Sequence, residues 1–139
     1  RSCTPTALSR AKAIKHAIDG DPATFWHSNW SRTKEKQPHE IQIDLSCGFA
    51  ISGFTYLPRQ NQSNGRIREY EFYASMDGKD WGKPLAKGQF RNSTNLQTVT
   101  FDRPVACRYI RLVSLSEVSG AYYTSAAEID IVATKRLEN

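Results

Sequence analysis

From residue 41 onward, the chain is divided into short segments of β-type patterning that are separated by turn residues. Residues 41–45 and 69–75 alternate apolar and polar side chains, which places alternate residues on opposite faces of a strand. The series continues through residues 51–57, 97–101, 108–113 and 128–133. Many short strands with turn signals between them predict an antiparallel all-β fold, either a sandwich or a barrel.

One segment near the start has helical spacing instead. Ala13, Ile14, Ala17 and Ile18 recur at intervals of three and four residues, before Gly20 and a proline end the pattern. We therefore expect one short N-terminal helix over residues 9–18, of at most about three turns.

The segments between the expected strands are long enough to carry a binding site. They cover residues 19–40, 59–66, 78–95 and 114–127, which we expect to be loops. Binding residues are often found on loops that a rigid scaffold holds in place.

Composition limits the classes of protein that the chain can represent. With 139 residues, it fits a single domain over residues 1–139. The net charge of +5 weakly favours anionic partners, but the basic residues are scattered, which argues against a nucleic-acid-binding arm. No apolar run approaches the length of a membrane span, and the start of the chain carries no signal peptide, so we expect no membrane insertion.

Three cysteines give little information about covalent cross-links. Cys3, Cys47 and Cys107 leave at least one thiol unpaired, and no CxxC spacing is present. The sequence therefore indicates no disulfide framework, no partner is assigned to Cys3, and whether Cys47 and Cys107 meet stays open.

The signatures of common active sites are absent. No GxSxG, GxGxxG or P-loop spacing occurs, and His39-Glu40 is followed by Ile43 where a zinc-protease helix needs a second histidine. The acidic residues Asp44, Glu69 and Glu71 fall on expected strands, where exposure to solvent explains them. We expect a protein that is not an enzyme.

Several motifs resemble the F5/8 type C, or discoidin, domains, and within that superfamily the family 32 carbohydrate-binding modules most of all. The resemblance covers nearly the whole chain. The motifs that carry it are Phe25-Trp-His-Ser-Asn-Trp30, Leu57-Pro-Arg-Gln60, Asn64-Gly-Arg-Ile67, Glu69-Tyr-Glu-Phe-Tyr73, Ser75-Met-Asp-Gly-Lys-Asp-Trp81, Tyr109-Ile-Arg-Leu112 and Ser125-Ala-Ala-Glu-Ile129. It implies a jelly-roll β-sandwich that holds a sugar in loops at one end and is appended to an extracellular glycoside hydrolase.

The resemblance also implies which residues form hydrogen bonds with the sugar. His27 would meet the axial hydroxyl of galactose, Arg59 would reach neighbouring hydroxyls, and Asn64 would add a donor and an acceptor. Imidazole, guanidinium and carboxamide groups can together read the stereochemistry of hydroxyls. Taken alone, His27 beside two tryptophans would more often be a packing residue.

An aromatic side chain just before residues 125–128 forms the stacking wall in such modules. Tyr122 and Tyr123 compete for this place, and Tyr123 fits the spacing better. Trp30 matches a second aromatic that lines the pocket in some members. An aromatic ring suits galactose, because the axial hydroxyl leaves a continuous C–H patch on one face of the sugar.

A structural calcium ion is the expected cofactor. Asp19, Asp21 and Thr24 offer oxygen ligands on a tight loop, although this spacing is not that of an EF-hand. The resemblance adds Glu128 and the carbonyl groups of His16 and Ala127, which would tie the early loop to the last strand.

Other readings remain open. A discoidin domain that binds anionic phospholipid is the runner-up, and a protein-interaction module is a third possibility. An acidic polysaccharide is a variant of the leading reading, with Arg32, Lys34, Lys36 or Arg66 as added contacts. Three N-x-Ser/Thr sequons begin at residues 29, 61 and 92, and glycans on the two that lie in the expected binding loops would obstruct the pocket, so a bacterial origin is expected. We also expect a monomer that is secreted or displayed at the cell surface.

Overall fold

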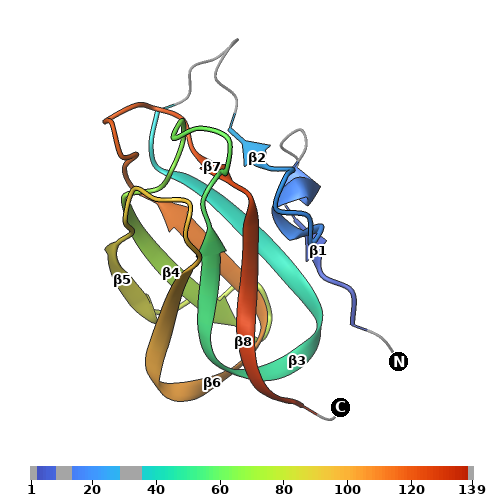
Figure 1. The fold of residues 1–139 in the computed structure, drawn as a ribbon. Helices are drawn as coiled ribbons and strands as arrows, with labels where there is room; N and C mark the ends of the chain where they lie inside the picture. Colours follow the sequence, from blue (N-terminus) through green and yellow to red (C-terminus); the bar gives the residue numbers. More distant parts are fainter. Residues whose placement is uncertain (1–2, 9–13, 29–35, 138–139) are drawn as a thin grey trace.

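A computed structural model describes residues 3–8, 14–28 and 36–137. Within these residues the chain forms eight strands and one short helix (Figure 1). In chain order they are β1 (Thr6–Ala7), η1 (Ile14–Ile18), β2 (Trp26–His27), β3 (His39–Leu57), β4 (Glu69–Ser75), β5 (Ala86–Gln89), β6 (Gln97–Ser114), β7 (Ser125–Ala126) and β8 (Glu128–Arg136).

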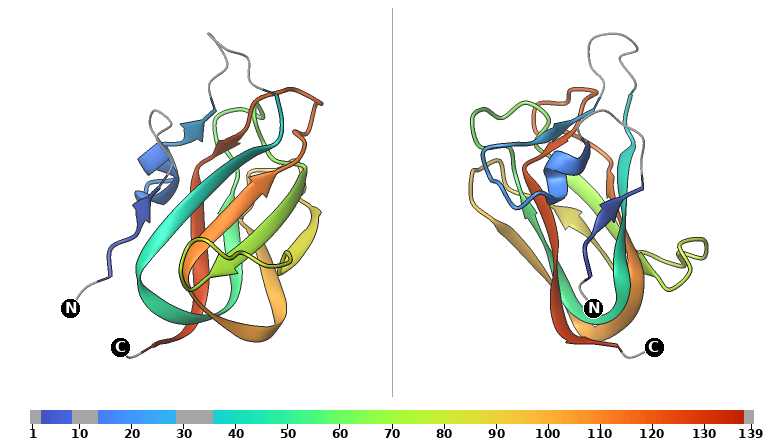
Figure 2. Two further views of the ribbon diagram at one scale, coloured as in Figure 1. Left: turned by 180° about the vertical axis from the view of Figure 1, so that it is seen from behind. Right: turned by 90° about the vertical axis from the view of Figure 1, so that its right-hand side faces the viewer.

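Two long strands, β3 and β6, bend so that each contributes to both layers of an antiparallel sandwich (Figure 2). One layer has the order β1-β3-β6-β4-β5, and in it Ile41 of β3 pairs with Leu112 of β6. In the other layer the second half of β3 pairs with the first half of β6 on one side and with β8 on the other. The all-β sandwich that the sequence predicted is confirmed.

The bend explains why the sequence suggested two separate strands within β3. The β3–β6 register shifts between Asp44 and Phe49, and Ser46 lies there with a φ of 69°. Irregularities of this kind bend a strand and increase its twist. Residues 41–45 and 51–57 are therefore two halves of one strand that face each other across the core.

Aromatic side chains fill the space between the layers. The ring of Phe54 stacks on that of Phe72 with centroids 4.0 Å apart, and Tyr70 stacks on Phe90 at 4.1 Å. Phe54, Phe72 and Tyr56 have no exposed surface. Burial of rings of this size is the main contribution to a sandwich core.

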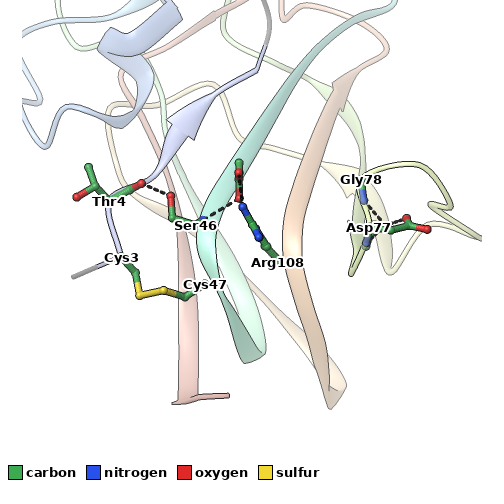
Figure 3. A network of polar contacts seen from close by, with 9 residues as sticks. Cys3, Thr4, Ser46, Cys47, Asp77, Gly78 and Arg108 are labelled. Carbon is green, nitrogen blue, oxygen red and sulfur yellow. Dashed lines mark hydrogen bonds and ion pairs between the residues drawn. A yellow bond between two sulfur atoms is a disulfide. The ribbon is translucent and has the colours of Figure 1, made fainter. Parts of the chain in front are cut away.

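A disulfide fastens the N-terminal segment to the bend of β3 (Figure 3). Cys3 is bonded to Cys47, and the neighbouring hydroxyl of Ser46 donates to the carbonyl of Thr4 at 2.5 Å. Cys107 is free and fully buried. The expectation of no disulfide framework is wrong, because the two cysteines are separated by 44 residues in sequence and are brought together by the bend of β3.

The same region contains an ion pair across the outer face of the first layer (Figure 3). Arg108 of β6 donates from Nε and Nη2 to the two carboxylate oxygens of Asp44, at 2.9 and 3.0 Å. Asp44 is therefore explained by pairing as well as by exposure, and this bidentate bond holds the pKa of its carboxyl below the ordinary value.

Several local expectations need correction. Residues 19–40 and 114–127, expected to be loops, contain the short strands β2 and β7, and the expected strands 97–101 and 108–113 are parts of the single strand β6. The described part of the expected helix, Ile14–Ile18, is a 3-10 helix, and residues 9–13 lie outside the described residues. Residues 78–95, expected to be a loop, contain β5, which pairs with β4. The sequence of β5, Ala-Lys-Gly-Gln, carries no apolar alternation, because this edge strand is half exposed or exposed along its length. None of the helices that the structure describes is long and apolar enough to cross a membrane.

Candidate functional site

A small two-stranded sheet, β2 paired with β7, lies at the end of the sandwich away from the bends of β3 and β6 (Figure 1). The loop after β3 and the loop between β6 and β7 reach the same end (Figure 1). His27 of β2 is the register partner of Ser125 of β7. This pairing brings the Trp-His-Ser segment, near the start of the chain, against the last loop before β8.

The imidazole of His27 is half-buried, and contacts with Ser28 and Tyr123 help to orient it. Nδ1 lies 2.7 Å from the carbonyl oxygen of Ser28, and the ring lies 5.1 Å from that of Tyr123, centroid to centroid. A carbonyl only accepts, so Nδ1 carries the proton and Nε2 is the acceptor nitrogen of the neutral ring. Burial lowers the pKa of His27 below its ordinary value, which favours this neutral form.

Arg59 follows β3 and is held rigidly at the base of its loop. Its side chain lies over the ring of Phe25, with the guanidinium carbon 3.9 Å from the centroid. Nε donates to the side-chain oxygen of Asn61 at 2.8 Å, and Nη2 lies 2.6 Å from the amide oxygen of Gln62 when that amide is oriented to match its neighbours. Arg59 is 8% exposed, and burial lowers the pKa of its guanidinium.

Asn64 lies at the tip of the same loop, and its neighbour Gly65 fixes the approach of that loop to β7. The hydroxyl of Ser125 donates to the carbonyl of Asn64 at 2.7 Å, and its amide donates to the carbonyl of Gly65 at 2.7 Å. Gly65 has a φ of +85°, and a Cβ there would stand 2.6 Å from the amide nitrogen of Ser125. Only glycine adopts this positive φ without strain and leaves room for the close approach of Ser125.

Tyr122 and Tyr123 lie on the loop that leads into β7, close to His27 of β2. Their ring centroids are 5.2 Å apart in an edge-to-face arrangement, and Tyr123 is the one whose ring contacts His27. Gln37 donates to the carbonyl of Tyr123 at 2.9 Å, and Nε2 of His39 lies 2.5 Å from the carbonyl of Tyr122. These backbone contacts hold both tyrosines in place.

Thus the structure brings together five of the six residues that the sequence proposed for the sugar. His27 and Asn64 come from separate parts of the chain and meet at Ser125, while Tyr123 lies beside His27, Tyr122 and Arg59. Trp30 lies outside the described residues. That these residues bind a sugar stays a prediction.

Two residues that support the site, Tyr56 and Glu117, could not be recognised from the sequence. Tyr56 is fully buried, and its hydroxyl donates to the carbonyl of Ser125 at 2.8 Å and accepts from the amide of Ile67 at 3.1 Å. Glu117 is 2% exposed and accepts hydrogen bonds from two loops. Neither residue stands in a motif with recognisable chemistry, and only the folded chain reveals their contacts.

The residues proposed for calcium gather on the loop before β2 and at the start of β8. Thr24 donates its hydroxyl to Asp19 Oδ2 at 2.5 Å, and the amide of Asp21 donates to Asp19 Oδ1 at 3.0 Å. Glu128 faces this loop, because a Cβ on Gly20 would stand 3.9 Å from its Oε1. Oε2 of Glu128 is buried and has no hydrogen-bond partner among the described atoms.

The charge around Glu128 fits a cation. Burial, followed by the negative charge of Asp19, raises the pKa of Glu128 to about 7. Ala127 precedes Glu128, and His16 lies in η1, which contacts β8. A buried carboxylate oxygen without a partner, facing other oxygen donors, is chemistry that suits calcium. Among the described residues, no group of three or more His, Cys, Asp or Glu side chains forms a metal cluster, so backbone carbonyls and Thr24 would have to complete the set.

Arg66, proposed as an added contact for an acidic glycan, is buried instead. It is 8% exposed, and it donates to the carbonyl of Arg59 and, at 2.9 Å, to the side-chain oxygen of Asn92. Its guanidinium therefore joins two loops. Of the other proposed basic contacts, Lys36 is exposed, whereas Arg32 and Lys34 lie outside the described residues.

A family model, related sequences and solved structures all relate this chain to the same family of domains. Residues 3–129 match the model of the F5/8 type C domain. A sialidase of Micromonospora viridifaciens is 44% identical over 117 residues, and a galactose oxidase of Gibberella zeae is 41% identical over 118 residues. These matches cover 84% and 83% of this chain but only 18% and 17% of the relatives, so the chain spans less than a fifth of their length.

Solved structures with the same fold include carbohydrate-binding modules of family 32. One, CpGH89CBM32-5 from Clostridium perfringens in complex with GalNAc-β-1,3-galactose, is 33% identical with a TM-score of 0.81, and the match covers 93% of this chain and 94% of that one. The family 32 module of C. perfringens NanJ in complex with galactose is 28% identical with a TM-score of 0.79, and the match covers 92% and 91% of the two chains.

Proposed function

The chain belongs to the F5/8 type C domain family as a non-catalytic module similar to family 32 carbohydrate-binding modules, and we propose that it binds a terminal sugar of the galactose type. Galactose, N-acetylgalactosamine and lactosamine share the axial hydroxyl that this proposal requires. Two similar modules were solved with galactose or a galactose-containing disaccharide bound.

The contact between His27 and Tyr123 is the observation that carries the proposal. It places an aromatic ring 5.1 Å from an imidazole whose Nε2 is an acceptor nitrogen in the neutral form. The C–H face of galactose would lie on Tyr123 while its axial hydroxyl donates to Nε2 of His27. An equatorial hydroxyl, as in glucose, would point away from this nitrogen.

Arg59 and Asn64 would read the neighbouring hydroxyls. Arg59 is held by Phe25 and Asn61, so little side-chain entropy is lost when its guanidinium donates to a sugar oxygen. Asn64 is exposed at the loop tip and offers one donor and one acceptor group. Trp30 is proposed as a second aromatic wall, as the family resemblance implies.

A site on exposed loops that holds one sugar should bind weakly, with a Kd of roughly micromolar to millimolar. We propose that the module is secreted or displayed at the cell surface and directs an attached enzyme to galactose-bearing glycans. The relatives support this proposal, because the matching stretch is a small part of much larger enzymes. Repeated weak contacts would then increase the overall avidity.

A structural calcium ion completes the proposal. Asp19, Asp21, Thr24, Glu128 and the carbonyls of His16 and Ala127 would hold it, and the ion would neutralise the buried carboxylate of Glu128. A ligand that binds only the folded state raises stability. Removing calcium with a chelator should lower Tm, and Glu128→Gln should abolish this difference; a chelator without effect on the wild type would contradict the site.

Isothermal titration with galactose, N-acetylgalactosamine and glucose tests the sugar proposal. The first two should bind, glucose should bind at least about tenfold more weakly, and His27→Ala should abolish binding. His16→Ala is the matched control, because His16 lies in η1 and contributes only its backbone to the proposed sites. Unchanged binding by His27→Ala would refute the pocket.

An acidic glycan is the second candidate, and it is favoured by the charge of the site. Arg59 is buried, yet the ion pair found among the described residues does not include it and joins Arg108 and Asp44 at the other end of the sandwich. A carboxylated or sulfated sugar could supply the missing negative charge. Its affinity would fall with rising salt concentration, whereas that for a neutral sugar would not.

A further inference from the structure

Glu117 lies on the loop between β6 and β7 that also carries Tyr122 and Tyr123 (the tyrosine loop), and its carboxylate faces the loop after β3 that carries Asn64 (the Asn64 loop). Its Oε2 accepts from the amide of Gly65 at 3.0 Å. Its Oε1 accepts from the amide and hydroxyl of Ser119, both at 2.5 Å, and from the amide of Ala121 at 3.1 Å. One oxygen thus bonds to the Asn64 loop, and the other folds the loop that leads to the tyrosines.

The carboxylate is buried without a cationic partner. Glu117 is 2% exposed, and no ion pair to it occurs among the described residues. A buried charge is costly unless hydrogen bonds replace its hydration. Burial would raise the pKa of Glu117, but the donors from Ser119, Gly65 and Ala121 outweigh it and hold the pKa below the ordinary value.

The backbone around Glu117 continues the same connection. Glu117 forms an isolated antiparallel bridge with Ile67, and the amide of Val118 donates to the carbonyl of Arg66 at 3.0 Å. The carbonyl of Gly65 accepts from the amide of Ser125 at 2.7 Å. Gly65 is therefore held between Glu117 and β7, the strand that pairs with His27.

We propose that Glu117 is a positioning residue that sets the distance between Asn64 and the Tyr122–Tyr123 pair, and so determines sugar affinity without touching the sugar. The inference rests on the proposed function. Its physical basis is that the two carboxylate oxygens bond to different loops, so both loops must adopt one spacing to satisfy the charge. Without the bond from Glu117 to Gly65, the Asn64 loop would keep its bonds to Ser125 and Val118 but would be placed less exactly, and restoring its position on binding lowers affinity.

Glu117→Gln removes the bond between the loops, from Glu117 to Gly65, while it leaves the bonds within the tyrosine loop in place. A carboxamide can place its oxygen toward Ser119 and Ala121, but its NH₂ group then faces the amide of Gly65 and cannot accept from it. The bond between the loops is lost while the bonds within one loop remain. We expect about tenfold weaker binding of galactose, which is the effect of about one charge-assisted hydrogen bond.

The test combines titration with a double-mutant cycle. Glu117→Gln should weaken galactose binding in the wild type but have little further effect in an Asn64→Ala background, because it acts through the placement of Asn64. A purely structural role predicts instead equal losses in both backgrounds. Glu71→Gln is the control for loss of one acidic residue, since Glu71 lies on β4 and bonds to Tyr73.

Amide hydrogen exchange provides a readout that does not depend on sugar. In Glu117→Gln the amide of Gly65 should exchange faster, while that of Ala121 stays protected. If the wild type binds galactose and Glu117→Gln binds it equally well, the positioning role is wrong and the proposed function stands. If the wild type binds no sugar, the proposed function fails and the positioning role fails with it, whatever the exchange rates show.

Discussion

The bond between Cys3 and Cys47 should contribute a large part of the stability of the domain. It closes a loop over a sequence separation of 44 residues, and the chain-entropy relation gives about 4 kcal/mol for a loop of that size. This amount is comparable with the whole free energy of unfolding of many domains, which is about 5–15 kcal/mol. Replacing both cysteines by serine should therefore leave a folded but marginal protein.

Urea denaturation followed by tryptophan fluorescence measures this effect. With a slope of about 2 kcal/mol per molar urea, a loss of about 4 kcal/mol lowers the midpoint by about 2 M. The single variant Cys3→Ser should match the double variant Cys3→Ser/Cys47→Ser, because either change opens the loop. Sugar affinity at low urea should change little, since the disulfide and the proposed site lie at opposite ends of the sandwich (Figures 1 and 3).

Cys107 should not interfere with this measurement. Its thiol is fully buried, and burial raises its pKa to about 11, so hardly any thiolate forms at neutral pH to exchange with the disulfide. If the free energy of unfolding of the double variant lies within about 1 kcal/mol of the wild-type value, the loop-entropy reasoning is refuted. A midpoint that shifts only in the double variant would show that Cys3 and Cys47 are not each other's partners.

Three further predictions concern the site. Tyr56→Phe should lower the free energy of unfolding by about 2–4 kcal/mol in chemical denaturation, because it leaves the carbonyl of Ser125 and the amide of Ile67 buried without partners; a loss below about 1 kcal/mol would contradict this. Gly65→Ala should weaken galactose binding and lower Tm, since a Cβ there meets Ser125 at 2.6 Å in a backbone of φ +85°; an unchanged Tm would refute the strain. Finally, titration at several pH values should show that affinity for galactose falls as the pH drops below about 6.5, because protonated His27 cannot accept from the axial hydroxyl; an affinity that stays constant down to pH 4 would contradict this role. Burial lowers the folded pKa of His27 below its unfolded value of about 6.5; the bond to the Ser28 carbonyl and the charge of Glu117 oppose this shift, and the charges of Arg59 and His39 add to it. The stability from neutral His27 is thus present above about pH 6.5 and is lost as pH falls through the lower folded pKa.

The strand pattern and the family motifs were accessible from the sequence because they are local. Residues 69–75 were predicted as a strand, and β4 has the same bounds. A strand with one buried face has apolar residues at alternate positions, so the pattern is visible in the sequence without knowledge of the strand's partners. The edge strand β5 was missed for the same reason: Ala86–Gln89 has no buried face to impose a pattern.

The candidate site shows the same division. His27, Arg59 and Asn64 stand in recognisable motifs, so they could be proposed from the sequence together with the tyrosine pair. The role of Glu117 could not, because an isolated glutamate resembles any exposed acidic residue until the fold removes it from water and surrounds it with amides. Nothing in its local sequence distinguishes it.

The sequence by itself determined that this chain forms an all-β module of one family, with a known set of motifs along it. Only the tertiary structure decided which distant residues meet: Cys3 with Cys47, Glu117 with Gly65, and His27 with Ser125. Periodicity reports the environment of each residue, buried or exposed, but carries no record of its partner. Partners are set by the bends of β3 and β6 and by the packing of loops, where many weak long-range contacts are satisfied together.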